Sequence, residues 1–430
     1  MVARMVTAAQ RTDARCPGAL HAVNARDGLL VRVRIPGGLL GAPALSALAR
    51  ASVQYGDGRL DFTARASVQL RGVRADGLNV LGDVLATAGL LPSRAHDRVR
   101  NVVASPFAGV DPDELLDPRP LVSQLDAALV ADPALAGLPA KFAFAVDGGG
   151  RPFPISRPDI ALHAVASVDG PHIHFVLGGT PTGVTTTPES APTLALAVAH
   201  AALAAATALG AAETWRLGSM QHVREAAQAA LHAPSAALRI VQPAPVPLAS
   251  NGIAVPLGTL AAREHDHINV VPSVPLGRLT AAQAIAVAEI AASVGADVRL
   301  GWWRGLVLAD VPRAVAAEVV AALTHLGLPC DRRDGFVGIA ACAGSAGCDA
   351  ALADVRRDAA GLAGRLAGAE ITGWSANFAG CEKRCAMRRG ASVDIVATPD
   401  GYDLFRAGGR VRTQASSADA LAFAHMCAPV

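Results

Sequence analysis

Two halves of this 430-residue chain share prolines, glycines and aromatic residues in the same order at a nearly fixed distance. Pro36-Gly37 corresponds to Pro275-Leu276, 239 positions later, and Gly89-Leu90 corresponds to Gly327-Leu328, 238 positions later. Further matches are Arg71-Gly72 with Arg304-Gly305, Phe142 with Phe378, Asp169-Gly170 with Asp400-Gly401, and Gly178-Gly179 with Gly408-Gly409. The distance drifts by a few residues, as loops of different length would cause. This self-similarity predicts an internal duplication, so that one fold forms twice.

Strand and helix patterns alternate within each half. Leu29–Ile35 and His267–Val274 are rich in β-branched residues and predict strands. Pro43–Arg50 predicts a helix with proline in its first turn, and Ala281–Ala292 predicts a helix capped by Thr280. Such alternation indicates mixed α and β layers rather than a helical bundle.

A proline-rich stretch separates the two halves. Val241–Leu248 reads VQPAPVPL, and repeated proline forces extended backbone that cannot lie inside a helix. We therefore predict a linker at residues 241–250. It divides a first repeat, residues 1–240, from a second repeat, residues 251–430.

The composition excludes broad classes of partner. Hydrophobic residues make up 52% of the chain and charged residues 17%, while a net charge of +2 gives no general attraction to nucleic acid or to an anionic membrane. Thr193–Ala212 contains no acid, lysine or arginine, but it is dominated by alanine and carries His200 midway, so we predict a buried helix rather than a membrane span. Met1–Gly28 lacks the continuous apolar region of a secretion signal, which predicts a cytoplasmic protein.

Four of the seven cysteines form two closely spaced pairs. Their order is Cys342-x5-Cys348, then 32 residues, then Cys381-x3-Cys385. Four thiolates in two pairs can hold a [4Fe-4S] cluster. Zinc is the main alternative, although zinc sites usually place about two to four residues between paired thiols. Disulfides are a further alternative, but without a secretion signal nothing indicates an oxidising compartment.

The segment Leu60–Arg71, LDFTARASVQLR, alternates apolar and polar residues as a strand does. One face would then belong to a core. The other face would carry Thr63, Arg65, Ser67, Gln69 and Arg71. Guanidinium and amide groups in a row suit carboxylates, which they bind through charge-assisted hydrogen bonds. An ordinary solvent-facing strand is the equal alternative.

Basic residues surround the last cysteine pair. Gly380–Gly390 contains Lys383 and three arginines against one acid. Such a field would stabilise thiolates and raise the reduction potential of a cluster. If the segment is helical, Cys381 and Cys385 share one face at i, i+4. A solvated helix end would carry the same charges.

Taken together, these residues resemble the sulfite/nitrite reductase superfamily over almost the whole chain. The resemblance rests on the duplicated halves, the two cysteine pairs, and the motifs Thr63-x-Arg65-x3-Gln69-x-Arg71-Gly72, Arg100-Asn101 and Leu138-Pro139-x-Lys141-Phe142. It implies an α+β, internally duplicated fold with ferredoxin-like half-domains at residues 20–95 and 251–332. Residues 96–240 would then form a basic, substrate-binding α/β domain, and residues 333–430 a cluster-binding one.

The resemblance also implies roles for individual residues. In siroheme reductases four such cysteines hold the cluster, and the last one, here Cys385, also bridges to the siroheme iron. Their arginine strand and the basic residues after it bind tetrapyrrole carboxylates and the small oxyanion. The implied ligands of a polycarboxylate macrocycle are Arg65, Gln69, Arg71, Arg100, Asn101 and Lys141, with Arg304 and Lys383 beside them. Trp302 and Trp303 would either line the cofactor cavity or fill core.

Within the superfamily, four segments resemble the precorrin-3B synthases, cobalamin-pathway enzymes that hydroxylate a reduced tetrapyrrole with dioxygen and close a lactone. These segments are Arg15–Gly18, Arg100–Gly109, Leu138–Asp147 and Gly380–Cys385. One departure from the reductases favours this branch. They typically carry a second lysine two residues after the first, where Ala143 stands here. Losing an ammonium group weakens stabilisation of a bound anion, whereas neutral dioxygen has no such need.

This branch implies precorrin-3A and dioxygen as substrates, and a mononuclear non-haem iron beside the [4Fe-4S] cluster. Siroheme would be bound only under the alternative, a siroheme-dependent sulfite or nitrite reductase. The ligands of the iron cannot be read from the sequence. The densest candidate set is His163, His172, His174 and Asp169, but ordinary paired or exposed strand histidines are the favoured explanation of this pattern. No Gly-x-Gly-x2-Gly fingerprint follows a strand, so NADH, if used, is expected to act through a separate reductase.

Overall fold

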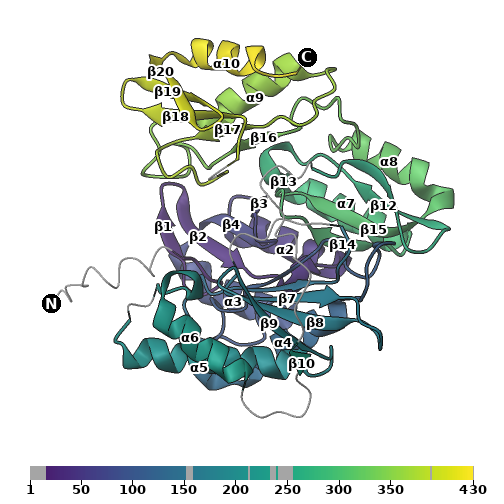
Figure 1. The fold of residues 1–430 in the computed structure, drawn as a ribbon. Coiled ribbons are helices and arrows are strands. Elements are labelled where there is room, and N and C mark those ends of the chain that lie inside the picture. The colour runs from purple at the N-terminus through teal and green to yellow at the C-terminus, as the bar shows by residue number, and fades with distance from the viewer. Residues whose placement is uncertain are drawn as a thin grey trace.

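The computed structural model describes residues 16–151, 158–211, 214–232, 239–240, 255–387 and 390–429. The predicted linker at residues 241–250 lies outside the described residues, as do Arg388 and Arg389 beside the last cysteine pair. The described chain forms four β-sheets. In Figure 1, helices α9 and α10 cover the C-terminal sheet at one end of the molecule, and helices α5 and α6 lie at the other end.

The first half-domain sheet has five antiparallel strands in the order β1-β2-β4-β3-β13. Its elements are β1 (Val23–Ala25), β2 (Gly28–Val33), η1 (Pro36–Gly38), α2 (Ala42–Tyr55), β3 (Arg59–Phe62), β4 (Val68–Val73), η2 (Ala75–Gly77) and α3 (Leu78–Thr87), with β13 (Arg278–Thr280) added at the edge. The predicted strand at Leu29–Ile35 and the predicted helix with proline in its first turn are thus confirmed. Because β13 comes from the second repeat, this sheet joins the two halves of the chain.

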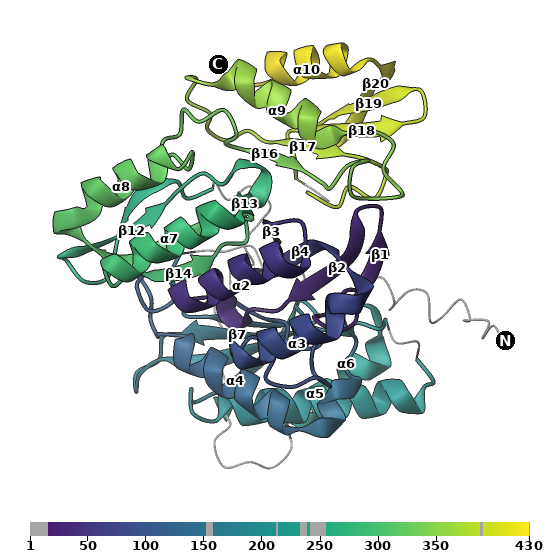
Figure 2. The same ribbon diagram turned by 180° about the vertical axis from the view of Figure 1, so that it is seen from behind.

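The second half-domain sheet repeats this strand order as β11-β12-β15-β14. Its elements are β11 (Gly258–Ala261), β12 (His267–Val271), η5 (Pro275–Gly277), α7 (Ala281–Ser293), β14 (Asp297–Leu300), β15 (Leu306–Pro312), η6 (Arg313–Val315) and α8 (Ala316–His325). Thr280 caps α7 as predicted, in a capping box with Gln283. Helices α2 and α7 pack side by side over one shared core (Figure 2).

Two α/β sheets complete the fold, with strand orders β10-β9-β8-β7-β6-β5 and β16-β17-β18-β19-β20. The first comprises β5 (Val102–Ala104), α4 (Arg119–Ala131), η3 (Pro133–Gly137), β6 (Phe144–Asp147), β7 (Ile160–Val165), β8 (His172–Leu177), β9 (Thr180–Thr186), α5 (Ala191–Ala208), η4 (Leu217–Ser219), α6 (Gln221–Leu231) and β10 (Arg239–Ile240). The second comprises β16 (Ile339–Ala341), α9 (Val355–Leu366), β17 (Ala376–Ala379), β18 (Val393–Thr398), β19 (Gly401–Arg406), β20 (Gly409–Ala415) and α10 (Ser417–Met426). Each sheet begins with three parallel strands and continues antiparallel. The predicted α+β fold and its internal duplication are confirmed.

The predicted single strand Leu60–Arg71 is wrong, because the segment forms a hairpin between β3 and β4. The Thr63 hydroxyl accepts hydrogen bonds from the backbone N–H groups of Arg65 and Ser67, and Ala66 has a φ of 49°. Arg65 therefore lies in a turn. Only Gln69 and Arg71 share a strand face, on β4.

Arg304 was matched to Arg71 by sequence, and the strand order corrects this match. β15 is the counterpart of β4, and Arg304 precedes it in the β14–β15 turn, with a φ of 65°. Its counterpart is therefore the turn that contains Ala66, which also has a positive φ. The two arginines reach their surroundings from different elements.

Helix α5 contains most of the alanine-rich segment that the sequence singled out. By length and composition alone it could cross a membrane. In the structure it packs against α4 and α6, and its buried residues recur at helical spacing: Ala191, Pro192, Ala195, Val198, Ala199, Ala202 and Ala206.

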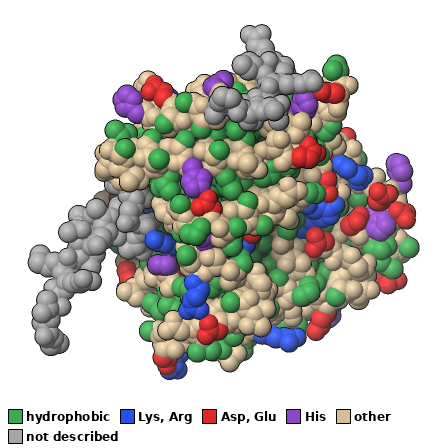
Figure 3. Space-filling model, turned by 90° about the horizontal axis from the view of Figure 1, so that it is seen from below, with side chains coloured by type: hydrophobic (Ala, Val, Ile, Leu, Met, Phe, Trp, Pro, Cys, Tyr) green, Lys and Arg blue, Asp and Glu red, His purple; other side chains and the backbone are tan. Residues whose placement is uncertain are grey.

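Figure 3 shows that charged side chains of both signs are scattered over the described part of the face seen from below.

Candidate functional site

The two cysteine pairs meet at one edge of the second α/β sheet. Cys342 follows β16, and Cys381 lies two residues after β17, the parallel neighbour of β16. The carboxyl ends of parallel strands lie at the same edge, which brings the two loops together. The backbone N–H of Gly380 donates to the Cys342 sulfur at 3.2 Å, and the N–H of Leu352 donates to the Gly380 carbonyl at 2.8 Å. The first pair's loop is thereby joined to the second.

None of the four cysteines forms a disulfide among the described residues; Cys385 is exposed and the other three are half-buried. The helix considered for Cys381–Cys385 is absent from this described segment, which forms a turn in which the N–H of Arg384 donates to the Cys381 carbonyl. Among the described residues, no group of three or more Cys, His, Asp or Glu side chains is arranged to hold a metal ion. A [4Fe-4S] cluster spreads its thiolates over separate irons, so its ligands stand further apart than those of a single zinc ion. Four cysteines outside any disulfide, on two joined loops and with an N–H donor at one sulfur, fit the ligand chemistry of such a cluster.

Arginines from other elements hold the backbone of the cysteine loops. The Arg71 guanidinium donates to the Gly347 carbonyl, next to Cys348, and is paired with Asp27. Arg356 Nε donates to the Cys342 carbonyl at 3.1 Å. In the second pair's loop, Arg304 Nη2 donates to the carbonyls of Cys385 and Ala386 at 2.8 and 2.6 Å. Guanidinium groups therefore contact the backbone of both loops.

A row of polar side chains crosses the first half-domain sheet beneath the cysteine loops. Arg32 is directly opposite Gln69, Gln69 is opposite Asp61, and Asp61 is opposite Arg278, so all four point to one face. Asp61 accepts hydrogen bonds from both Arg278 and Arg356. Burial would raise the pKa of Asp61, but these hydrogen bonds hold it below its usual range. This face offers the cationic and amide groups that a polycarboxylate needs.

Arg34 belongs to this cationic region and was missed in the sequence. It is buried, and its guanidinium donates to the Asn101 side chain and to the carbonyls of Pro17 and Ala140. Burial, together with the charge of Arg32, lowers the pKa of Arg34 to about 9. The alternation in LLVRVRI, where Arg32 and Arg34 share a face opposite two valines, was the signal that could have found both arginines.

The other predicted ligands differ in how deeply they are buried and in which groups they contact. Arg100 is buried in a two-pronged pair with Asp126, and the Asn101 amide donates to the carbonyls of Arg98, Ala140 and Phe142. Lys141 and Lys383 are exposed, whereas Arg65 and Gln69 are half-buried. Their roles as macrocycle ligands stay predictions, and Arg100 would have to leave Asp126 to contact a substrate.

The histidine candidates lie on one face of the first α/β sheet. His163 is directly opposite His174, and its Nδ1 is 3.1 Å from an Asp147 oxygen. His163 Nε2 and both ring nitrogens of His174 are buried without a hydrogen-bond partner, and burial lowers the pKa of His174. His172 lies 3.6 Å from Asp169. These histidines complete no metal-binding group of three among the described residues, so their role as iron ligands stays a prediction.

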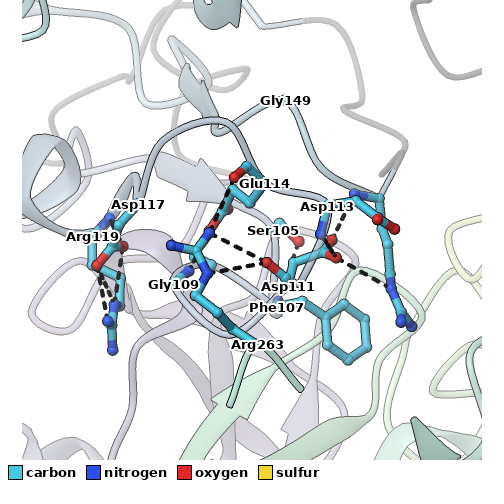
Figure 4. A network of polar contacts seen from close by, with 12 residues as sticks. Ser105, Phe107, Gly109, Asp111, Asp113, Glu114, Asp117, Arg119, Gly149 and Arg263 are labelled. Carbon is cyan, nitrogen blue, oxygen red and sulfur yellow. Dashed lines mark hydrogen bonds and ion pairs between the residues drawn. The ribbon is translucent and has the colours of Figure 1, made fainter. Parts of the chain in front are cut away.

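The counterpart of the first cysteine loop, between β5 and α4, carries carboxylates instead of thiols. In Figure 4, Arg263 lies between Glu114 and Asp111 and donates to both of their carbonyls. Phe107 in this loop stacks on Trp303 at 6.4 Å between ring centroids. The half-buried Trp303 therefore packs against a small apolar core here.

Comparisons with known proteins agree with this architecture. The description "Nitrite/Sulfite reductase ferredoxin-like half domain" matches residues 21–87 and again residues 261–326, and "Nitrite and sulphite reductase 4Fe-4S domain" matches residues 95–229. The last segment contains no cysteine, so the cysteine pairs belong to the other copy of this domain. The chain belongs to the nitrite/sulfite reductase family.

Among individual relatives, precorrin-3B synthase from Sinorhizobium sp. is 30% identical over 406 residues, which are 93% of this chain and 83% of that protein. Sulfite reductase [ferredoxin] 2 from Mycolicibacterium paratuberculosis is 26% identical over 85% of this chain and 69% of its own length. Ferredoxin–nitrite reductase from Leptolyngbya laminosa is 37% identical, but over only 28% of this chain and 24% of its own. The solved structure of Mycobacterium tuberculosis NirA has the same fold, with a TM-score of 0.73 at 22% identity over 91% of this chain and 78% of that one.

Proposed function

We propose that this protein is a precorrin-3B synthase-like monooxygenase of aerobic cobalamin biosynthesis. It would hydroxylate precorrin-3A with dioxygen and close a γ-lactone. The observation that carries the proposal is the similarity to the Sinorhizobium precorrin-3B synthase, which extends over 93% of the chain. The reductase relative of comparable coverage is less similar, at 26% identity.

The surroundings of Ala143 support the same choice. Ala143 is buried, and its N–H donates to Asp159, whose carboxylate also pairs with Arg216. A second lysine, which the reductases typically carry here, is missing, and only the exposed Lys141 remains in this motif. The site thus lacks one of two charges that would stabilise a bound sulfite or nitrite.

The polar face of the first half-domain sheet would bind the acid arms of the macrocycle. Arg32 and Gln69 would hold carboxylates there, with Arg65 in the adjoining β3–β4 turn, and a fixed macrocycle presents one meso carbon to the oxidant, which is an orientation effect. The bound cluster would supply electrons one at a time. Overall, one oxygen atom of dioxygen enters the substrate and the other leaves as water, which takes two electrons and two protons from a donor. We propose NADH acting through a separate reductase as that donor.

The experiment is an anaerobic purification followed by turnover. We expect iron and acid-labile sulfide, an absorption spectrum without the Soret band of a haem-type cofactor, and conversion of precorrin-3A to a product that gains one oxygen atom from isotopically labelled dioxygen. Tightly bound siroheme with dye-driven reduction of sulfite or nitrite would replace this proposal with the reductase alternative. The mononuclear iron is tested separately, by iron in excess of that in the cluster.

A further inference from the structure

Three guanidinium groups hold the backbone of the cysteine loops. They belong to Arg71 on β4, Arg304 in the β14–β15 turn and Arg356 at the start of α9, and they bind the carbonyls of Gly347, Cys385 and Cys342 respectively. Each carbonyl belongs to a cysteine or to the residue before one. Arginines from three separate elements thus converge on the same short segments.

The geometry of Arg304 is fixed by its backbone. Its φ of 65° lies in the left-handed region, which a residue with a side chain rarely adopts. Gly277 faces it, and a Cβ on Gly277 would lie 2.7 Å from the Arg304 Cβ. The turn and the missing side chain at position 277 let Arg304 reach the carbonyls of Cys385 and Ala386.

The charges of these arginines are compensated to different degrees. Arg71 is neutralised by Asp27, at 2.6 Å. Arg356 shares the carboxylate of Asp61 with Arg278. Arg304 donates to two backbone carbonyls, those of Cys385 and Ala386, which carry no net charge, although the Asp61 carboxylate also lies near enough to act on it. A guanidinium group therefore lies next to each cysteine pair, and the one beside Cys385 is bound to carbonyls rather than to a carboxylate.

We propose that Arg71, Arg304 and Arg356 are positioning residues for the cysteine loops, and that Arg304 and Arg356 raise the reduction potential of the cluster. Reduction adds one negative charge to the cluster, and nearby positive charge stabilises the reduced state. Arg71 and Arg304 would then act on the cofactor rather than on the macrocycle. This inference rests on the cluster in the proposed function, but on neither the substrate nor the oxygen chemistry.

The test is the midpoint potential of the anaerobic holoprotein, measured without substrate by a dye-mediated titration followed by electron paramagnetic resonance. Arg304→Met should lower the reduction equilibrium constant about tenfold, which is about 59 mV for one electron. Arg304→Lys keeps the charge and should lower it by less than about threefold. The matched control is Arg74→Met, because Arg74 is exposed and pairs only with Asp76 among the contacts described; it should keep the native potential.

A second variant keeps the proposal testable if Arg304→Met assembles no cluster. Arg26 is exposed and donates to the Ser345 carbonyl in the first pair's loop at 3.0 Å. Arg26→Met should fold and lower the equilibrium constant about twofold at low salt, with less effect at high salt. A native potential in Arg304→Met, or in Arg26→Met where Arg304→Met holds no cluster, would overturn the proposal. A native protein that holds the cluster but leaves precorrin-3A unchanged would refute the proposed function and leave this inference standing.

Discussion

The loops at residues 105–118 and 342–354 occupy the same place in the two copies of the α/β sheet, but they carry different side chains. Each follows the first strand of its sheet, leads into the first helix, and contacts the half-domain sheet of the other repeat. The first loop is bound by Arg263 and Arg299 through backbone carbonyls. The second is bound by Arg26 and Arg71 in the same way. What differs is the inward side chains, which are the buried acids Asp111 and Glu114 with Phe107 in the first loop and the thiols of Cys342 and Cys348 in the second.

This difference indicates how a duplicated fold comes to have one cofactor site. The loop-to-sheet contact is needed in both copies, because it joins the repeats, and arginine-to-carbonyl bonds supply it in both. Redox ligands are needed once. In the first copy the space beside the loop is filled by Trp303, for which Gly301 and Gly305 leave room; a Cβ on either would lie about 2.5 Å or less from the indole ring.

The largest difference between the two copies is expected when one polar side chain of the site is replaced in each. Cys381→Ser removes a thiolate and should abolish most of the bound iron and sulfide, since each cluster iron needs its own ligand. Asp111→Asn in the other copy should leave the iron and sulfide content unchanged. Metal and acid-labile sulfide analysis of anaerobic preparations measures both. Full cluster content in Cys381→Ser would mean that the cluster ligands lie elsewhere.

The next largest effect concerns the carboxylate below the second loop. Asp61→Asn leaves the half-buried Arg278 and Arg356 with no carboxylate between them, and losing one partner of a largely buried ion pair costs about 3 kcal/mol of unfolding free energy. The stabilisation should be present at neutral pH and lost as the pH falls through the lowered pKa of Asp61. Urea unfolding measures the change, with the exposed Asp76→Asn as control. Equal stability of the two variants would show that the pair contributes nothing.

A smaller effect is expected where the two cysteine loops touch. A Cβ on Gly380 would lie 2.6 Å from the Ala351 Cβ and 3.4 Å from the Cys342 sulfur. Gly380→Ala should therefore cost about 2 kcal/mol by overpacking and reduce cluster content. Gly364 in α9 meets no atom within 4 Å, so Gly364→Ala should instead stabilise the protein by about 0.5 kcal/mol. If both variants behave alike, the loops do not pack as described.

Much of the fold could be predicted because the repeated motifs and the helix start signals are each contained in a few consecutive residues. The proline in the first turn of α2 and the Thr280 cap each mark one helix start, and repetition doubles the evidence. The β3–β4 hairpin was missed for a physical reason. Phe62 and Val68 lie opposite each other across the hairpin, six positions apart, so the alternation of apolar residues continues in phase through the turn.

The site was predicted only in part. The spacing of cysteines in the sequence indicates cluster ligands, but it does not indicate which distant residues an arginine contacts in the fold. The cysteine pairs have a short, recognisable spacing. In contrast, Arg71 meets Gly347 across 276 positions, Arg304 meets Cys385 across 81, and Arg100 meets Asp126 across 26. Whether an arginine is available to a substrate depends on such contacts, which only the folded chain brings together.

The smallest expected effect is a pH dependence confined to the loop without thiols. Burial raises the pKa of Glu114 to about 7, although the Gly109 N–H and Arg263 oppose this rise. In the folded state Glu114 therefore keeps a proton that the unfolded chain has lost at the same pH. Its contribution to stability is complete below the unfolded pKa of about 4.5 and is lost as the pH rises through about 7.

Glu114→Gln should remove this dependence, because an amide does not titrate and can still accept from Gly109. Its melting temperature relative to the native protein should rise between pH 5 and about 7.5 as the native protein loses the proton. Glu289→Gln, an exposed change on α7, is the control and should follow the native profile. The second copy has thiols and no buried carboxylate at this place, so cluster content should not follow the same profile. Parallel profiles for Glu114→Gln and the native protein would show that this acid is already ionised in the fold, and that the network of Figure 4 is an ordinary set of ion pairs.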